Sequence, residues 1–84
     1  HPDVVIGDRV CIMHEVTIGS NEGPDGARTG VPRIGNDVFI GAGAKVLGGI
    51  TVGDGARIAA NSLVVTDVPA GATVVGVPAR VMRG

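Results

Sequence analysis

The residue best suited to proton-transfer chemistry is His14, in the segment Ile12-Met-His-Glu-Val-Thr-Ile-Gly19. An imidazole has an unperturbed pKa of about 6.5, so it exchanges protons near neutral pH. The other histidine, His1, stands at the first position. Glu15 follows His14, but neighbouring residues on a strand point to opposite faces, so we do not expect Glu15 to orient His14.

Composition excludes several classes of protein. The chain has 84 residues with Lys+Arg 7 against Asp+Glu 8, so no charge excess draws it to nucleic acid or an anionic membrane. No stretch approaches the roughly 20 apolar residues of a membrane span. The single cysteine, Cys11, rules out a disulfide framework and a cysteine-based zinc cage. A reducing, cytoplasmic compartment is therefore expected.

The residues that must position any site are small and aliphatic. Fifteen glycines accompany one aromatic residue, Phe39, and the chain has no Trp or Tyr. Because aromatic side chains usually provide much of the core area of a small domain, this core must be thin and built from Val, Ile and Ala. Such a composition favours a repeat architecture.

An aliphatic residue recurs every six positions. The matches are Ile6, Ile12, Ile18, Ile34, Ile40, Val46, Val52, Ile58 and Val64. A second small or aliphatic register follows four residues later, at Val10, Val16, Val38, Ala44, Ile50, Ala56, Ser62 and Val68. A helix would repeat every 3.6 residues and a half-buried strand every 2, so neither explains the period. Three hexads per coil predict an all-β parallel β-helix of about three coils.

Two segments interrupt the period. Residues 20–32 are polar and rich in turn formers, which predicts an extended loop on the solenoid. Residues 67–84 lack the aliphatic residue expected at position 70 and contain Pro69 and Pro78. We expect this closing segment to leave the last coil and lie against it. The chain is interpreted as one domain over residues 1–84, and its start in mid-pattern suggests the C-terminal part of a longer protein.

The motifs together resemble those of the hexapeptide-repeat acyltransferases. The run Ile40-Gly-Ala-Gly-Ala-Lys-Val-Leu-Gly48 and the ending Gly76-Val-Pro-Ala-Arg80 are most similar to the C-terminal half of serine O-acetyltransferases. The resemblance covers essentially the whole chain. It implies a left-handed β-helix, a homotrimer with active sites between subunits, and acetyl-CoA as acyl donor without a metal.

The same resemblance implies which residues bind CoA. Carried over from sugar acetyltransferases of this fold through the hexad register, they are Ala42, Ala60, Val65, Thr66, Arg80 and Arg83. The alanines and Val65 would act through backbone and close approach, and Thr66 could add its hydroxyl. The two arginines would hold phosphate. Lys45 could assist a phosphate, although a solvated corner lysine also explains it.

The position of the catalytic base is where this chain departs from the family pattern. In serine acetyltransferases it lies one coil earlier, in a segment that would fall before residue 1. A second family histidine, just after the loop, aligns with Val31, and the loop itself contains no histidine. His14 is therefore the candidate catalytic base, with contact to substrate or cofactor, or a surface or interface position, as alternatives.

Other functions remain open from the sequence. Serine is the leading acceptor, a sugar or polysaccharide hydroxyl is the alternative that Val31 favours, and an N-acyltransferase of nucleotide sugars is a third. A non-enzymatic hexapeptide assembly module is the competing class. A γ-type carbonic anhydrase needs three imidazoles for its zinc, and an ice-binding solenoid needs threonines in register, and the chain has neither.

Overall fold

Short strands joined by tight turns form the whole described structure. It is a computed structural model that describes residues 3–20 and 30–82. The strands are β1 (Val5–Ile6), β2 (Cys11–Ile12), β3 (Thr17–Gly19), β4 (Arg33–Ile34), β5 (Phe39–Ile40), β6 (Lys45–Leu47), β7 (Thr51–Val52), β8 (Arg57–Ile58), β9 (Leu63–Val64), β10 (Thr73–Gly76) and β11 (Ala79–Val81). Within these residues, no helix is long and apolar enough to cross a membrane.

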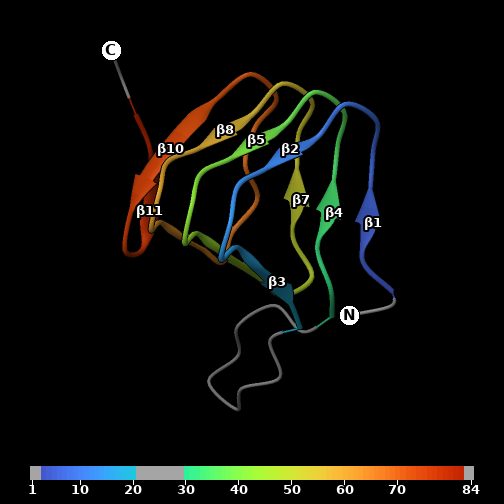
Figure 1. Ribbon diagram of the computed structural model, residues 1–84, viewed down its shortest axis with the longest axis horizontal. Helices are drawn as coiled ribbons and strands as arrows, with labels where there is room; N and C mark the ends of the chain where they lie inside the picture. The colour runs from blue at the N-terminus through green and yellow to red at the C-terminus, as the bar shows by residue number, and fades with distance from the viewer. Residues whose placement is uncertain (1–2, 21–29, 83–84) are drawn as a thin grey trace.

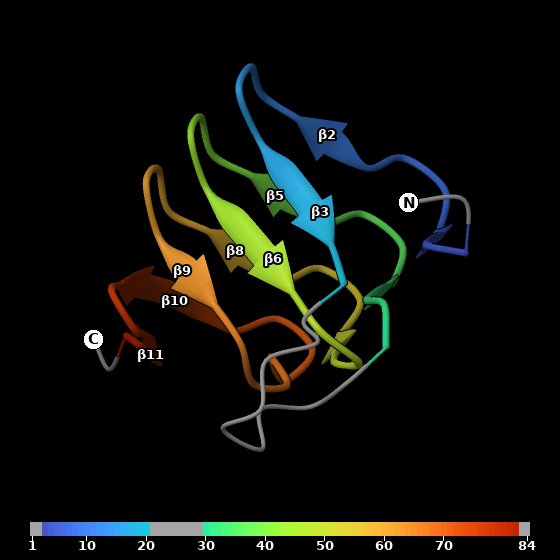
Figure 2. The ribbon, with the colours of Figure 1, turned by 90° about the horizontal axis from the view of Figure 1, so that it is seen from below.

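The strands stack into three sheets, and each of the first three coils contributes one strand to each sheet (Figure 1). The orders are β1-β4-β7, β2-β5-β8-β10-β11 and β3-β6-β9. All pairs are parallel except β10 with β11. Three coils and three sheets confirm the β-helix predicted from the period of six, and Figure 2 shows the sheet of β3, β6 and β9 from below.

The strand register follows the hexads. Ile6 pairs with Ile34 and Ile34 with Val52, and the equivalent residues of the other two sheets stack in the same way. The buried apolar residues are Ile34, Val38, Ile40, Ala44, Val46, Ile50, Val52, Ala56, Ile58, Val64, Val68 and Val74. All but Val74 belong to the two predicted registers, so the period of six identified the buried residues of the later coils. In the first coil the prediction does not hold, since Ile6 is 46% and Ile12 41% exposed.

Three corners connect the sheets. The first corner joins the β1-β4-β7 sheet to the β2-β5-β8 sheet through residues 8–9, 36–37, 54–55 and 70–71. The second corner joins that sheet to β3-β6-β9 through residues 14–15, 42–43 and 60–61. The third corner returns the chain to the first sheet. The predicted loop at 20–32 falls between β3 and β4 in the sequence. Most of that loop, residues 21–29, is outside the described residues.

The C-terminal segment stays with the solenoid further than expected. Val68 pairs with Val52, and Thr73–Val74 pair in parallel with Arg57–Ile58, so a partial fourth coil follows the third. This coil is shorter, because Val68 follows Val52 by 16 residues whereas Val52 follows Ile34 by 18. Only β11 turns back, antiparallel to β10 (Figure 1). The expectation that the chain leaves the last coil at residue 67 was therefore wrong for residues 68–76.

Candidate functional site

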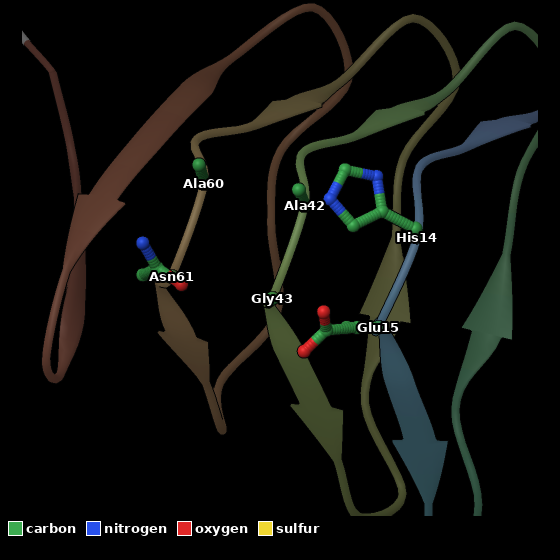
Figure 3. Close-up of a pocket in the computed structure, with 6 residues that line it drawn as sticks. All are labelled: His14, Glu15, Ala42, Gly43, Ala60 and Asn61. Atoms are coloured by element: carbon green, nitrogen blue, oxygen red, sulfur yellow. The ribbon is translucent and has the colours of Figure 1, made fainter.

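The second corner contains a groove of about 230 Å³ that crosses three stacked coils. It is lined by His14, Glu15, Ala42, Gly43, Ala60 and Asn61, two residues from each coil. Figure 3 shows the His14 ring extended toward Ala42 and the Glu15 carboxylate directed toward Gly43. This corner groove brings together the candidate base His14 and two predicted CoA-binding residues, Ala42 and Ala60.

Backbone hydrogen bonds hold the turns of the groove above one another. The Gly43 N–H donates to the His14 carbonyl at 3.1 Å, and the Asn61 N–H donates to the Ala42 carbonyl at 2.9 Å. Among the residues that the structure describes, no acceptor is recorded for the N–H groups of Ala42 and Ala60. Backbone binding by the two alanines, which stays a prediction, would need two such donors in neighbouring coils.

His14 and Glu15 do not alternate as strand residues. They form the turn after β2, where Glu15 has a positive φ of 60°, and both line the same groove. The expectation that they point to opposite faces was therefore wrong, because strand alternation stops where the turn begins. The two side chains form no hydrogen bond with each other, as expected if Glu15 does not orient the imidazole.

The other predicted binding residues lie elsewhere. Val65 and Thr66 follow the C-terminal end of β9, whereas Ala60 and Asn61 precede its start, so Val65 and Thr66 are at the third corner. Arg80 is exposed on β11, where it pairs with Val75 of β10. Arg83 is outside the described residues. Lys45 is exposed on β6. The structure thus gathers three of the seven predicted site residues in one place.

A second hollow, of about 370 Å³, lies on the outer face of the β1-β4-β7 sheet. Its lining includes Val5, Arg33, Gly35, Thr51 and Gly53. It contains none of the predicted site residues. Despite its larger volume, we place the functional site at the corner groove, which combines an imidazole, a carboxylate and a carboxamide.

Sequence reasoning missed Glu15, Gly43 and Asn61 as groove residues. The sequence could have indicated these three residues, because each directly follows one of the recognised residues His14, Ala42 and Ala60. Gly43 and Asn61 are also 18 residues apart, the length of one coil. Comparing coils at this spacing, with allowance for the loop, would have placed all six residues in one row.

The chain matches known proteins in sequence and in structure. The bacterial transferase hexapeptide family (six repeats) matches residues 32–66. The serine acetyltransferase of Helicobacter pylori is 52% identical over 75 residues, which cover 89% of this chain and 43% of that protein. The crystal structure of Neisseria gonorrhoeae serine acetyltransferase superposes with a TM-score of 0.87 at 44% identity, over 99% of this chain and 32% of that one.

A serine acetyltransferase structure in complex with CoA superposes with a TM-score of 0.84 at 45% identity. The described fold and the matched hexads define this chain as a left-handed β-helix of the hexapeptide-repeat transferase class. Within that class, it is similar to the serine acetyltransferases over nearly all of its length. It spans about a third to two fifths of the length of these relatives.

Proposed function

We propose that this chain forms the acetyl-CoA-binding β-helix of an O-acetyltransferase whose acceptor is a small hydroxyl compound, with serine as the first candidate. The likeness to serine acetyltransferases supports the reaction class. The observation that supports the proposal most strongly is the distribution of functional groups along the solenoid axis.

The charge of the side chains changes along the solenoid axis, from the corner groove to the hairpin of β10 and β11. His14 and Glu15 stand in the first coil, Ala42 and Ala60 follow in the second and third, and Arg80 lies on β11 beyond the fourth. CoA has its phosphates at one end and its thioester at the other. A CoA molecule with its phosphates near the arginine and its thioester near His14 matches this order, because phosphate groups are attracted to arginine and repelled by Glu15.

In this arrangement the acceptor hydroxyl attacks the thioester carbonyl carbon while His14 Nε2 or Nδ1 takes the hydroxyl proton. The tetrahedral intermediate then collapses, the bond between carbon and sulfur breaks, and the proton returns to the CoA thiolate. The products are the acetyl ester and free CoA. The N–H groups of Ala42 and Ala60 are available to hold carbonyl groups of the CoA arm.

We further propose that the protein is a cytoplasmic homotrimer. An 84-residue chain buries only about 60% of its unfolded surface, which leaves a small margin of stability. Apolar side chains remain exposed on the first coil, including Ile12 and Met13, each 41% accessible. Association would cover such residues. Sedimentation of a folded monomer at micromolar concentration would contradict the trimer.

A sugar or polysaccharide hydroxyl is the alternative acceptor, because Val31 departs from the serine acetyltransferase pattern. The two acceptors are compared by following CoA thiol release from acetyl-CoA with the full-length protein. Faster release with serine than with simple glycosides supports serine, and the reverse result supports the sugar. No CoA binding and no transfer would favour the non-enzymatic assembly module.

The role of His14 is tested in the same assay with His14→Gln. If His14 is the general base, kcat falls by about 10²- to 10⁴-fold while the affinity for CoA changes little. If kcat is retained and KM for acetyl-CoA rises, His14 is a contact residue and the base lies elsewhere.

A further inference from the structure

The first coil leaves side chains of the core register uncovered. Ile6 and Ile12 are 46% and 41% exposed. Their partners in the next coil, Ile34 and Ile40, are 2% and 0% exposed. The strands of the first coil, β1 and β2, lie at the end of the stack (Figure 1). Apolar side chains exposed together on one surface indicate contact with another segment, so this end of the solenoid is a candidate interaction surface.

At the first corner, each coil binds the coil before it through two hydrogen bonds. Asn36 Oδ1 accepts the Asp8 N–H at 2.8 Å, and the Asp37 N–H donates to the Asp8 carbonyl at 2.9 Å. One coil later, Asp54 Oδ1 accepts the Asn36 N–H at 2.8 Å. The Gly55 N–H donates to the Asn36 carbonyl at 2.8 Å. We call this arrangement the corner clamp: a side-chain oxygen and the next backbone N–H hold one residue of the preceding coil.

A glycine precedes each residue that the corner clamp holds. A Cβ added at Gly7 would overlap Asn36 Oδ1, and a Cβ added at Gly35 would overlap Asp54 Oδ1. The clamp therefore requires glycine directly before the residue whose N–H it accepts. It does not continue into the fourth coil, because Ala70 at the equivalent position has no side-chain oxygen. The clamp is thus a property of particular residues and not of every turn at this corner.

Asp8 and Arg9 present the same groups at the open end of the first coil. Asp8 stands one coil before Asn36, and Arg9 stands one coil before Asp37. The exposed Asp8 carboxylate forms no hydrogen bond with the residues that the structure describes, and neither does the Arg9 backbone N–H. The Arg9 guanidinium is bound on the other side, to Asp37 in the next coil at 2.7 Å. The acceptor and the donor of a corner clamp are therefore both available here.

We propose that the first coil binds a further coil of the same protein, formed by residues that precede residue 1. The Asp8 carboxylate accepts a backbone N–H of that coil, and the Arg9 N–H donates to the carbonyl of the same residue. The occupant is a parallel coil, because every corner clamp connects coils that run in one direction. The fourth coil of a second copy does not fit, because the antiparallel β11 covers its edge in one sheet. The Helicobacter pylori relative has more than half of its length outside the matched part, which is enough for such a coil.

The test is amide hydrogen exchange in the full-length protein. Asp8→Ala should raise the exchange rate of one backbone N–H by about three- to tenfold, the value of one lost hydrogen bond. That N–H should belong to a residue that precedes residue 1 and directly follows a glycine. Asn36→Ala is the reference, because it removes a bond seen in the structure and should release the Asp8 N–H by a similar factor. Asp8→Asn is the matched control: it keeps the acceptor oxygen, as Asn36 does in the next coil, and should leave the N–H protected.

Two results would overturn the inference. The first is an exchange pattern for Asp8→Ala that equals the parent pattern while Asn36→Ala releases the Asp8 N–H. The second is a released N–H that lies within residues 1–84, because Asp8 would then bind another part of this chain or a second copy. Asp8 is exposed, so the loss of its side chain should leave the protein folded, and an unchanged circular dichroism spectrum checks this. The inference does not depend on the proposed function, since none of these results involves CoA or an acceptor.

Discussion

Gly41 and Gly19 both follow a hexad aliphatic residue, yet the structure predicts opposite effects when each is changed to alanine. A Cβ at Gly41 would stand 2.6 Å from the Ala60 nitrogen and 2.9 Å from the Ala60 Cα. These are backbone atoms of the next coil, which cannot rotate away. A Cβ at Gly19 would meet only Leu47 Cδ2, at 3.8 Å, which is an ordinary contact.

Both substitutions reduce the conformational freedom of the unfolded chain, which stabilises the folded state by about 0.4–1 kcal/mol. Gly19→Ala should show this gain alone. Gly41→Ala adds an overpacking cost of about 1–3 kcal/mol, because the coils must separate at the groove. The two variants should therefore differ by about 1–3 kcal/mol in unfolding free energy, or at least about 4 °C in Tm for a domain of this size.

The assay is thermal unfolding followed by circular dichroism, at one protein concentration so that association does not distort the comparison. Equal Tm values for the two variants would refute the reasoning, because the close approach of the Gly41 and Ala60 backbones would then not limit side-chain size. Gly41→Ala should also weaken CoA binding, since it displaces one wall of the corner groove.

Three further predictions concern the core, the surface and the C-terminal hairpin. Ile58→Ala should cost about 2–5 kcal/mol in denaturant unfolding, because Ile58 is fully buried in the third coil, whereas Ile12→Ala should cost less because Ile12 is 41% exposed. The Arg9 hydrogen bonds lower the Asp37 pKa in the folded state, so this pair stabilises the fold above the unfolded pKa of about 3.9, and the stabilisation is lost as the pH falls through the folded pKa. Asp37→Asn should therefore flatten the pH dependence of Tm in this acidic range. A pH dependence unchanged from the parent protein would contradict this prediction. Arg80→Ala should raise the Kd for CoA while leaving Tm within about a degree of the parent, and an unchanged Kd would remove Arg80 from the binding site.

The sequence was sufficient to predict the repeat and the core. Each hexad places one aliphatic residue inward, and a single slip would move every later residue to another face, so a period sustained from Ile34 to Val64 determines the stacking. The chemistry of the corners was harder to predict. Whether Glu15 follows strand alternation depends on where β2 ends, and a two-residue strand leaves no pattern from which to read that boundary.

The shortened fourth coil illustrates another limit. The sequence marks a break after Val64, but it does not show that the chain can omit two residues and still pair. In the structure, Asp67 Oδ1 accepts the Thr51 N–H at 2.9 Å, and the Val68 N–H donates to the Thr51 carbonyl at 2.9 Å. A carboxylate thus takes the place of a backbone carbonyl in the ladder. This compensation depends on three-dimensional position, so the hexad pattern alone could not predict it.

Ser62 connects the groove to the hairpin that carries Arg80. Its side chain is buried beneath the second corner, and its Oγ accepts the Gly76 N–H at 3.2 Å. Gly76 ends β10, one coil beyond the turn formed by Ala60 and Asn61, so this bond holds the start of the hairpin turn at the end of the corner row. The distance between the corner groove and Arg80 is therefore set by a buried contact rather than by a free C-terminal tail. A long, extended ligand such as CoA benefits from this rigidity, because its two ends can bind together only if their sites keep a fixed separation.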